Sequence, residues 1–170
     1  MSAVPAVLRV LHDGERALER ELLATAGRHP AEHEVHHVAT DLARWSHEHA
    51  ERIARAAEPH GLHWPEPAAD ASHDGRPGLP LMSERPARPG GEPAGPDLGL
   101  LDDLRGLHLA ATDNSLSWEM LAQAAQATGD GDLLALASTC HPQTLRQLRW
   151  TNTMLKTLAP QLITSANGSS

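Results

Sequence analysis

Phe and Tyr are absent from this sequence, so its aromatic content is 2% and consists of four Trp. Strands favour aromatic and β-branched residues, whereas Ala and Leu, which dominate the apolar residues here, favour helices. A hydrophobic fraction of 40% over 170 residues suffices for one core. The sequence therefore predicts a single all-α domain. Within it, Trp45, Trp118 and Trp150 are expected to anchor the core, and Trp64 to anchor a partner or cover a seam of the fold.

Cysteine is nearly absent as well, because Cys140 stands alone and cannot form an internal disulfide. The chain opens with no charged and apolar leader, and no apolar run approaches the roughly 20 residues that span a bilayer. These absences predict a cytoplasmic protein without a membrane partner. Cys140 is expected in the core, because the adjacent His141 diverges from it by about 100° on a helix and cannot serve as its base.

Basic clusters and phosphate-binding loops are also missing. The formal net charge is -8 with His counted neutral, and no stretch clusters Lys or Arg, so the basic surface of a nucleic-acid binder is not present. No glycine-rich loop of the Gly-x-x-x-x-Gly-Lys kind occurs. Nucleic acids and nucleotides are therefore not expected as partners.

Apolar residues recur three and four positions apart over four long segments, which is the pattern of helices with one buried face. The predicted helices cover residues 4–28, 31–58, 97–128 and 132–162. Pro30 is expected to be an early residue of the second helix. Pro142 is expected to interrupt and kink the fourth helix.

Short turns join the first helix to the second and the third to the fourth, so each pair is expected to form an antiparallel hairpin. Residues 60–96 are rich in Pro and Gly and lose the periodicity, which predicts a long crossover. Such a crossover lets the second and third helices run parallel. The sequence thus predicts one domain over residues 1–164, a four-helix bundle of ferritin-like topology, followed by a flexible tail at 165–170.

Three stretches carry a resemblance to a known family. Residues 11–15 read Leu-His-Asp-Gly-Glu, the second helix has the inward pair Ser46 and His49 at Glu-x-x-His spacing, and residues 118–120 read Trp-Glu-Met. In these features the chain resembles the small stress-associated ferritin-like proteins of bacteria. The resemblance implies a four-helix bundle and, where the ligands are kept, a di-iron site built from carboxylates of all four helices and two His.

The resemblance places six residues at the ligand positions of such a site: Glu15, Ser46, His49, Asn114, Thr144 and Gln147. Only Glu15 and His49 retain metal-binding side chains. Glu119 lies about 90° from the centre of its inner face, and the fourth helix contains no acid after Asp132. We therefore expect a degenerate site in which Glu15 and His49 make a buried polar contact.

A second group of metal-capable side chains lies on the second helix. Helical spacing places five of them on one stripe: His33, His36, His37, His47 and Glu51. Side chains at this spacing suit Zn, Ni or Cu. The stripe lies opposite the apolar face and has no enclosing side chains, so we expect it to be a solvated surface.

Three functions compete for this sequence. The leading hypothesis is a non-catalytic, metal-free ferritin-like bundle that needs no cofactor and acts through contact with an unknown protein or a second copy of itself. The alternative is a stress-related protein in which a reduced site around Glu15 and His49 binds iron or manganese. A weaker alternative is a carrier of small apolar ligands in the bundle core.

Overall fold

All regular secondary structure in the described part of the chain is helical. The computed structural model describes residues 2–65 and 96–165, so most of the crossover predicted at 60–96 and of the tail at 165–170 lies outside the described residues. The helices are α1 Val4–Arg28, α2 His33–Ala57, the short 3-10 helix η1 Glu58–His60, α3 Pro96–Thr128 and α4 Gly131–Ser165. No strand occurs within the described ranges, and the predicted all-α class is confirmed.

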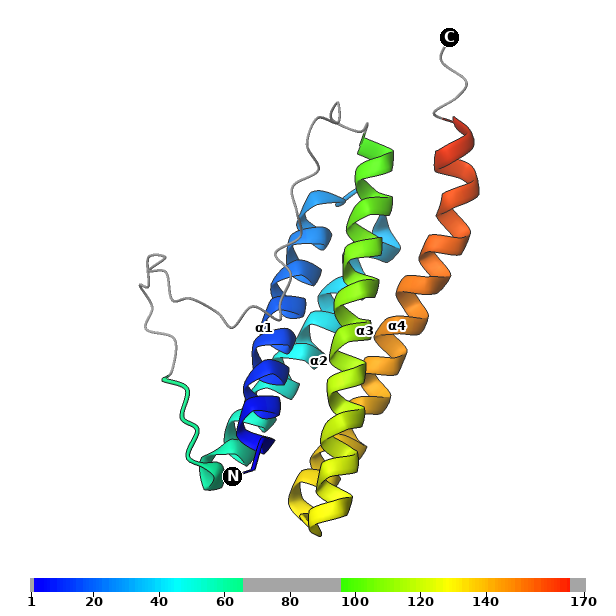
Figure 1. The fold of residues 1–170 in the computed structure, drawn as a ribbon. Helices are drawn as coiled ribbons and strands as arrows, with labels where there is room; N and C mark the ends of the chain where they lie inside the picture. Colours follow the sequence, from blue (N-terminus) through cyan, green and yellow to red (C-terminus); the bar gives the residue numbers. More distant parts are fainter. Residues whose placement is uncertain (1, 66–95, 166–170) are drawn as a thin grey trace, which may run out of the picture.

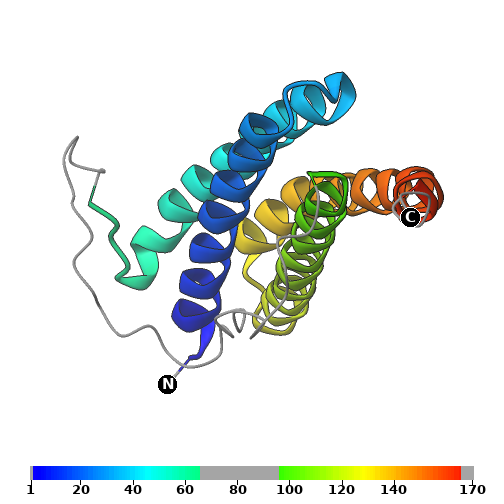
Figure 2. The same cartoon turned by 90° about the horizontal axis from the view of Figure 1, so that it is seen from above.

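The four long helices pack side by side as a bundle (Figure 1). The α1–α2 hairpin and the α3–α4 hairpin each have extensive internal contacts, and the two hairpins meet mainly between α1 and α3. The contact between α2 and α4, here called the α2–α4 seam, is much less extensive. Figure 1 shows α2 and α3 running in the same direction, as the long connection between them predicted. Figure 2 shows the C-terminal end of α4 extending away from the α1–α2 hairpin.

Two apolar clusters, one toward each end of the bundle, form the core. The first cluster takes buried residues from the C-terminal half of α1 and the N-terminal halves of α2 and α3, with Met154 from α4. The second cluster takes them from the opposite ends of the same helices. Several core side chains are at most 1% exposed, among them Leu18 and Leu104 of the first cluster and Leu8 and Ile53 of the second cluster. Each such side chain contributes roughly 1.5–3 kcal/mol by leaving water.

A layer of buried polar side chains separates the two clusters. Six residues define this polar layer, and each is at most 3% exposed: Glu15, Ser46, His49, Asn114, Thr144 and Gln147. They continue the inner faces of the helices, as Glu15 does between Leu11 and Leu18 of α1. This polar layer therefore lies between the two ends of the bundle.

The structure differs from the sequence prediction at two proline residues. α2 begins at His33, and Pro30 lies in the preceding turn, where the backbone N–H of Glu32 donates to the carbonyl of His29. The prediction of Pro30 as an early helical residue is therefore wrong. α4 is also not interrupted at Pro142. Pro142 is exposed, so the carbonyl that loses its helical hydrogen bond lies on the solvent side, where water can reach it.

The Trp residues divide between core and surface. Trp118 is completely buried, whereas Trp45 and Trp150 are half-buried and pack against the first cluster. Trp64 follows η1 and stacks on His12 of α1, with ring centroids 4.1 Å apart. Trp64 therefore closes one edge of the second cluster against α1.

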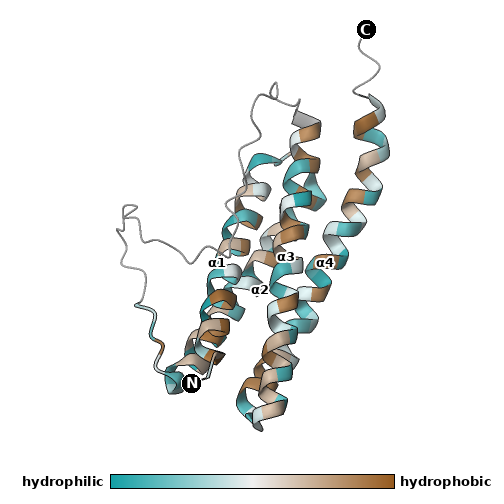
Figure 3. Cartoon of the chain, in the orientation of Figure 1, coloured by the Kyte–Doolittle hydropathy of each residue, from teal (hydrophilic) through white to brown (hydrophobic). Residues whose placement is uncertain are grey.

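Hydrophobic and hydrophilic residues are mixed along every helix (Figure 3). The apolar residues form stripes that face the two clusters, as expected for helices with one buried face. None of the described helices combines the length and the apolar character that a membrane span requires.

Gly14 marks a close approach of α1 to α3. A Cβ atom at Gly14 would overlap the side-chain oxygen of Asn114. Asn114 is only 3% exposed, so its amide has little room to move. Glycine is therefore required at this position because of the contact between the helices, although the local backbone is helical.

Gly14→Ala is expected to lower the free energy of unfolding by about 1–3 kcal/mol, because the added methyl group must displace the Asn114 amide. Gly27→Ala is the matched control in the same helix, since a Cβ there meets no atom within 4 Å. The control should raise the free energy of unfolding by roughly 0.5–1 kcal/mol through helix propensity. Urea unfolding followed by circular dichroism measures both, and equal effects would contradict the close approach.

Candidate functional site

The polar layer is the candidate functional site, because it holds the residues that the sequence places at ligand positions. α1 supplies Glu15, α2 supplies Ser46 and His49, α3 supplies Asn114, and α4 supplies Thr144 and Gln147. Each lies on the same face as the apolar core residues of its helix, so each points into the bundle. The structure thus brings all six predicted positions into one layer between the apolar clusters.

Glu15 and His49 are in direct contact in this layer. His49 Nδ1 lies 3.2 Å from Glu15 Oε1, and the two side chains are 1% and 0% exposed. The Trp118 Nε1–H donates to the same carboxylate oxygen at 3.0 Å. The indole ring also meets the imidazole edge-on, with centroids 5.9 Å apart. The predicted contact between Glu15 and His49 is confirmed, and Trp118 adds a second donor to the carboxylate.

The other ring nitrogen of His49 is engaged as well. His49 Nε2 lies 2.7 Å from Oε1 of Gln143 on α4. Both ring nitrogens therefore lie within hydrogen-bonding distance of oxygen atoms. The Glu15 carboxylate likewise has two polar neighbours, His49 and Trp118, and a buried carboxylate without such partners would be strongly destabilising.

Gln147 connects α4 to α2 within the layer. Its Nε2 donates to Ser46 Oγ at 2.9 Å and to the carbonyl oxygen of Leu42 at 3.1 Å. A hydrogen bond of this kind contributes about 0.5–1.5 kcal/mol. These bonds define the register of α4 on α2 along the seam where the helices have few other contacts.

Four buried polar atoms of the layer have no hydrogen-bond partner among the described residues: Glu15 Oε2, Asn114 Nδ2, Thr144 Oγ1 and Gln147 Oε1. Buried polar atoms without a partner are costly, and most proteins contain few of them. Three of these atoms are oxygens, the donor type that hard cations prefer. Whether the layer fits the metals that the resemblance implies depends on how many carboxylates and imidazoles accompany these oxygens.

The donor set does not fit a di-metal site. Two cations close together need several carboxylates to offset their charge, but the layer has the single carboxylate of Glu15 and the single imidazole of His49. Both His49 nitrogens and one Glu15 oxygen already have partners. Over the described ranges, no three His, Cys, Asp or Glu side chains are grouped so that they could hold a metal ion.

Two further acids named by the sequence pattern lie outside the layer. Glu119 is exposed on α3, as its angular position predicted. Asp132 lies in the first turn of α4, at the end of the bundle that contains the second cluster. Neither carboxylate supplements Glu15 in the layer.

The residues of the His stripe on α2 have two different kinds of surroundings. His33 and His37 are exposed, as expected for a solvated surface. His47 instead turns toward α1, where its Nδ1 lies 2.9 Å from Oε1 of Glu19, and His36 Nδ1 lies 2.8 Å from a backbone carbonyl oxygen of α1. Both residues thus have partners on α1, which the prediction of a solvated stripe did not include, although the His47 side chain is still 43% exposed. α1 packs along that side of α2, and the pattern of α2 alone does not reveal its neighbour.

Cys140 is a core residue of the second cluster and is 1% exposed. Burial raises the pKa of its thiol to about 12, and the nearby positive charge of Arg52 offsets this only in part. A thiol that stays neutral at physiological pH is a poor nucleophile and a poor metal ligand. The predicted core role of Cys140 is confirmed.

The sequence patterns did not indicate two hydrogen-bond partners in the layer, Gln143 and Trp118. Gln143 precedes Gln147 by one helical turn, so the spacing of the two amides was the signal that both could reach the layer. Trp118 was assigned to the core, but a buried indole N–H generally needs an acceptor, and Glu15 on the facing helix supplies one.

Comparisons with protein-family models, with curated proteins and with solved structures give no match to this chain. The function therefore has to be argued from the residues of the polar layer and from the surfaces of the bundle. The layer offers the Glu15–His49 pair with its neighbours, several neutral groups, and four buried polar atoms without a partner among the described residues.

Glu15→Leu and His49→Leu are each expected to lower the free energy of unfolding by about 3–5 kcal/mol, because each leaves the other polar group buried without its partner. The double variant Glu15→Leu/His49→Leu should lose much less than the sum, since it removes both groups together. Glu21→Leu, at an exposed position of α1, is the control and should change stability by less than about 0.5 kcal/mol. Urea unfolding of all four variants tests the coupling, and additive losses would refute it.

Proposed function

We propose that this protein is a ferritin-like bundle that works without catalysis or a metal centre, through contact with another protein. The observation that carries the proposal is the state of the two residual ligands. Glu15 and His49 bond to each other, and their remaining contacts go to Trp118 and Gln143. Three of the four donor atoms of this pair are thus engaged within the fold and are not presented to a substrate or an ion. The fourth, Glu15 Oε2, has no partner among the described residues.

The other ligand positions support the same proposal. Ser46 and Gln147 hydrogen-bond with each other, and Asn114 packs against Gly14 of α1. All of these side chains are neutral, so they do not offset the charge of metal ions. The direction of the four helices, with α2 parallel to α3 (Figure 1), supports the ferritin-like topology.

One exposed surface supports a role in protein contact. Leu109, Leu116 and Met120 of α3 are 55%, 53% and 57% exposed. Intervals of seven and four residues put them on one side of the helix. This α3 outer stripe presents large apolar side chains to solvent, which is typical of surfaces that bind another protein. The partner is either a different protein or a second copy of this chain.

A metal-binding stress protein is the second candidate, and one observation favours it. Glu15 Oε2, Thr144 Oγ1 and Gln147 Oε1 are buried oxygen atoms without a partner among the described residues. In this candidate they would bind a single iron or manganese ion. The ion would have to compete with the contacts that Glu15 already makes to His49 and Trp118.

Elemental analysis distinguishes the two candidates. Protein purified without chelator, loaded with iron or manganese and then desalted is expected to retain no stoichiometric metal, because one carboxylate and one engaged imidazole bind such ions weakly. Glu15→Ala and His49→Ala variants should give the same result as the wild-type chain. Near-stoichiometric metal that either substitution removes would establish the second candidate and reject the first.

A photo-crosslinking amino acid at position 116 tests the α3 outer stripe. In cells, it is expected to give a discrete adduct with one protein, because Leu116 lies in the centre of the stripe. The matched control is the same crosslinker at position 23, since Leu23 is 48% exposed but lies on α1. Mass spectrometry of the adduct identifies the partner or a second copy. Equal labelling from positions 23 and 116, or none, would reject the stripe as a contact surface.

A further inference from the structure

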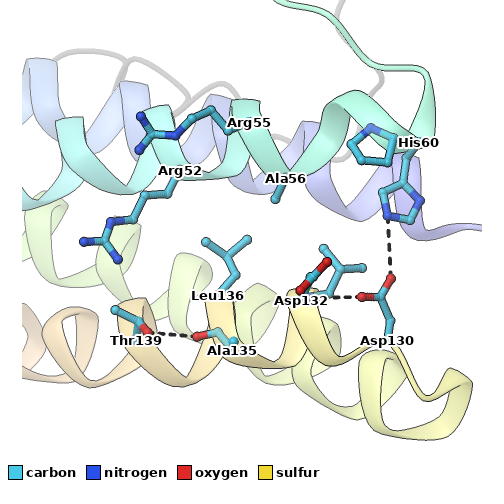
Figure 4. Close-up of a pocket in the computed structure, with 11 residues that line it drawn as sticks. Arg52, Arg55, Ala56, His60, Asp130, Asp132, Ala135, Leu136 and Thr139 are labelled. Carbon is cyan, nitrogen blue, oxygen red and sulfur yellow. Dashed lines mark hydrogen bonds and ion pairs between the residues drawn. The ribbon is translucent and has the colours of Figure 1, made fainter.

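A groove opens at the α2–α4 seam, away from the polar layer. It lies between the last turns of α2 with η1 and the first turns of α4, and it has a volume of about 500 Å³ (Figure 4). Ligand sites of proteins have volumes of roughly 300–1,000 Å³. The few contacts between α2 and α4 explain why the surface is hollow at this point. The groove is therefore large enough for a small molecule.

Charged side chains are segregated along this groove. Arg52 and Arg55 of α2 lie at one end, and Asp130, Asp132 and His60 lie at the other (Figure 4). Along α2 and η1, His60 follows Arg52 by eight residues and Arg55 by five, which corresponds to roughly 8–12 Å at a helical rise of about 1.5 Å per residue. The groove thus has a cationic end and an acidic end at a defined spacing.

Apolar side chains form the middle of the groove. Ala56 of α2 faces Leu136 of α4 between the charged ends (Figure 4), and Leu133 of α4 also lines the groove. Leu133 is 2% exposed and belongs to the second cluster, and Leu136 packs against that cluster. This floor is therefore continuous with the core and is held in place by it.

At the cationic end the described residues do not hold the two guanidinium groups in ion pairs, although Glu48 and Glu51 lie one helical turn before Arg52 and Arg55 on α2. Within the described part of the chain, neither Arg52 nor Arg55 makes an ion pair with a carboxylate. The acidic end is anchored differently, because Asp130 Oδ1 accepts the Leu133 backbone N–H at 3.0 Å and its Oδ2 lies 3.7 Å from His60 Nε2. Asp130 is thereby fixed at the start of α4, and two guanidinium groups remain available for an external anion.

We infer that this groove binds a dipolar small molecule that has an anionic group, an apolar middle and a cationic amine. The anion would lie at Arg52 and Arg55, where guanidinium groups can bind a carboxylate with two parallel hydrogen bonds. The apolar middle would pack on the floor of the groove. The amine would lie at Asp130 and Asp132, whose carboxylates already interact with the positive N-terminal end of α4 and would repel an anion.

The charge pattern distinguishes this ligand from simpler ones. A plain anion would use the Arg pair but would leave the acidic end without a partner, and a plain amine would do the reverse. Only a molecule with both charges, spaced to match the groove, engages both ends. The inference does not rest on the proposed protein contact, because the α3 outer stripe and the groove involve different helices.

The test uses the full chain and four probes in a titration followed by 1H–15N correlation spectra. 8-Aminooctanoate is the matching zwitterion, 4-aminobutanoate is a short zwitterion, and octanoate and octylamine each carry one charge. 8-Aminooctanoate is expected to shift amide signals of residues 52–60 and 130–139 and to bind about tenfold more tightly than each of the other three.

Substitutions at each end then separate the contributions. Arg52→Ala/Arg55→Ala should weaken binding of 8-aminooctanoate and octanoate about tenfold, whereas Asp132→Asn should weaken binding of 8-aminooctanoate but not of octanoate. Arg20→Ala, at an exposed position of α1, is the control and should leave all affinities unchanged. The inference is overturned by shifts outside the groove, by octanoate binding as tightly as the zwitterion, or by no shifts up to about 10 mM of probe.

Discussion

The contact between Glu15 and His49 constrains how the whole bundle can pack. A buried carboxylate requires partners, and the ones it has come from two other helices: His49 on α2 and Trp118 on α3. His49 in turn reaches Gln143 on α4. A shift of any helix by one turn would carry a polar group into an apolar cluster and leave its partner unpaired, at a cost of several kcal/mol. We therefore regard the polar layer as the feature that sets the register of four helices whose Leu-rich ends could pack in more than one way.

The sequence predicts the helices and the polar layer well, for a clear physical reason. Both depend on the period of a single helix, and a residue such as Glu15 that interrupts an apolar face must either be buried with a partner or be functional. The sequence does not predict which side of one helix meets the next. The contact of His47 with Glu19 and that of His49 with Gln143 depend on the rotation of neighbouring helices. Pro142 shows the same limit, because its effect depends on whether the lost hydrogen bond faces solvent.

The neutral residues of the layer are as informative as the charged pair. In a site that holds metal ions, Ser46, Thr144 and Gln147 would be poor substitutes for carboxylates. In a layer that joins helices, Ser46 and Gln147 serve well, because their hydroxyl and amide groups bond across helix boundaries without carrying charge into the interior. Thr144 Oγ1 has no such partner among the described residues. The surfaces that the two proposals concern lie outside this layer, on α3 and along the α2–α4 seam.

The location of the charged pair within one hairpin has a consequence for folding kinetics. Glu15 and His49 belong to α1 and α2, which a short turn connects, so they can meet through a local loop closure before the rest of the chain is organised. Trp118 and Gln143 belong to the second hairpin, so their contacts to this pair require the two hairpins to dock. A folding route in which the α1–α2 hairpin forms first would keep the Glu15 carboxylate next to a polar partner before docking removes water from it.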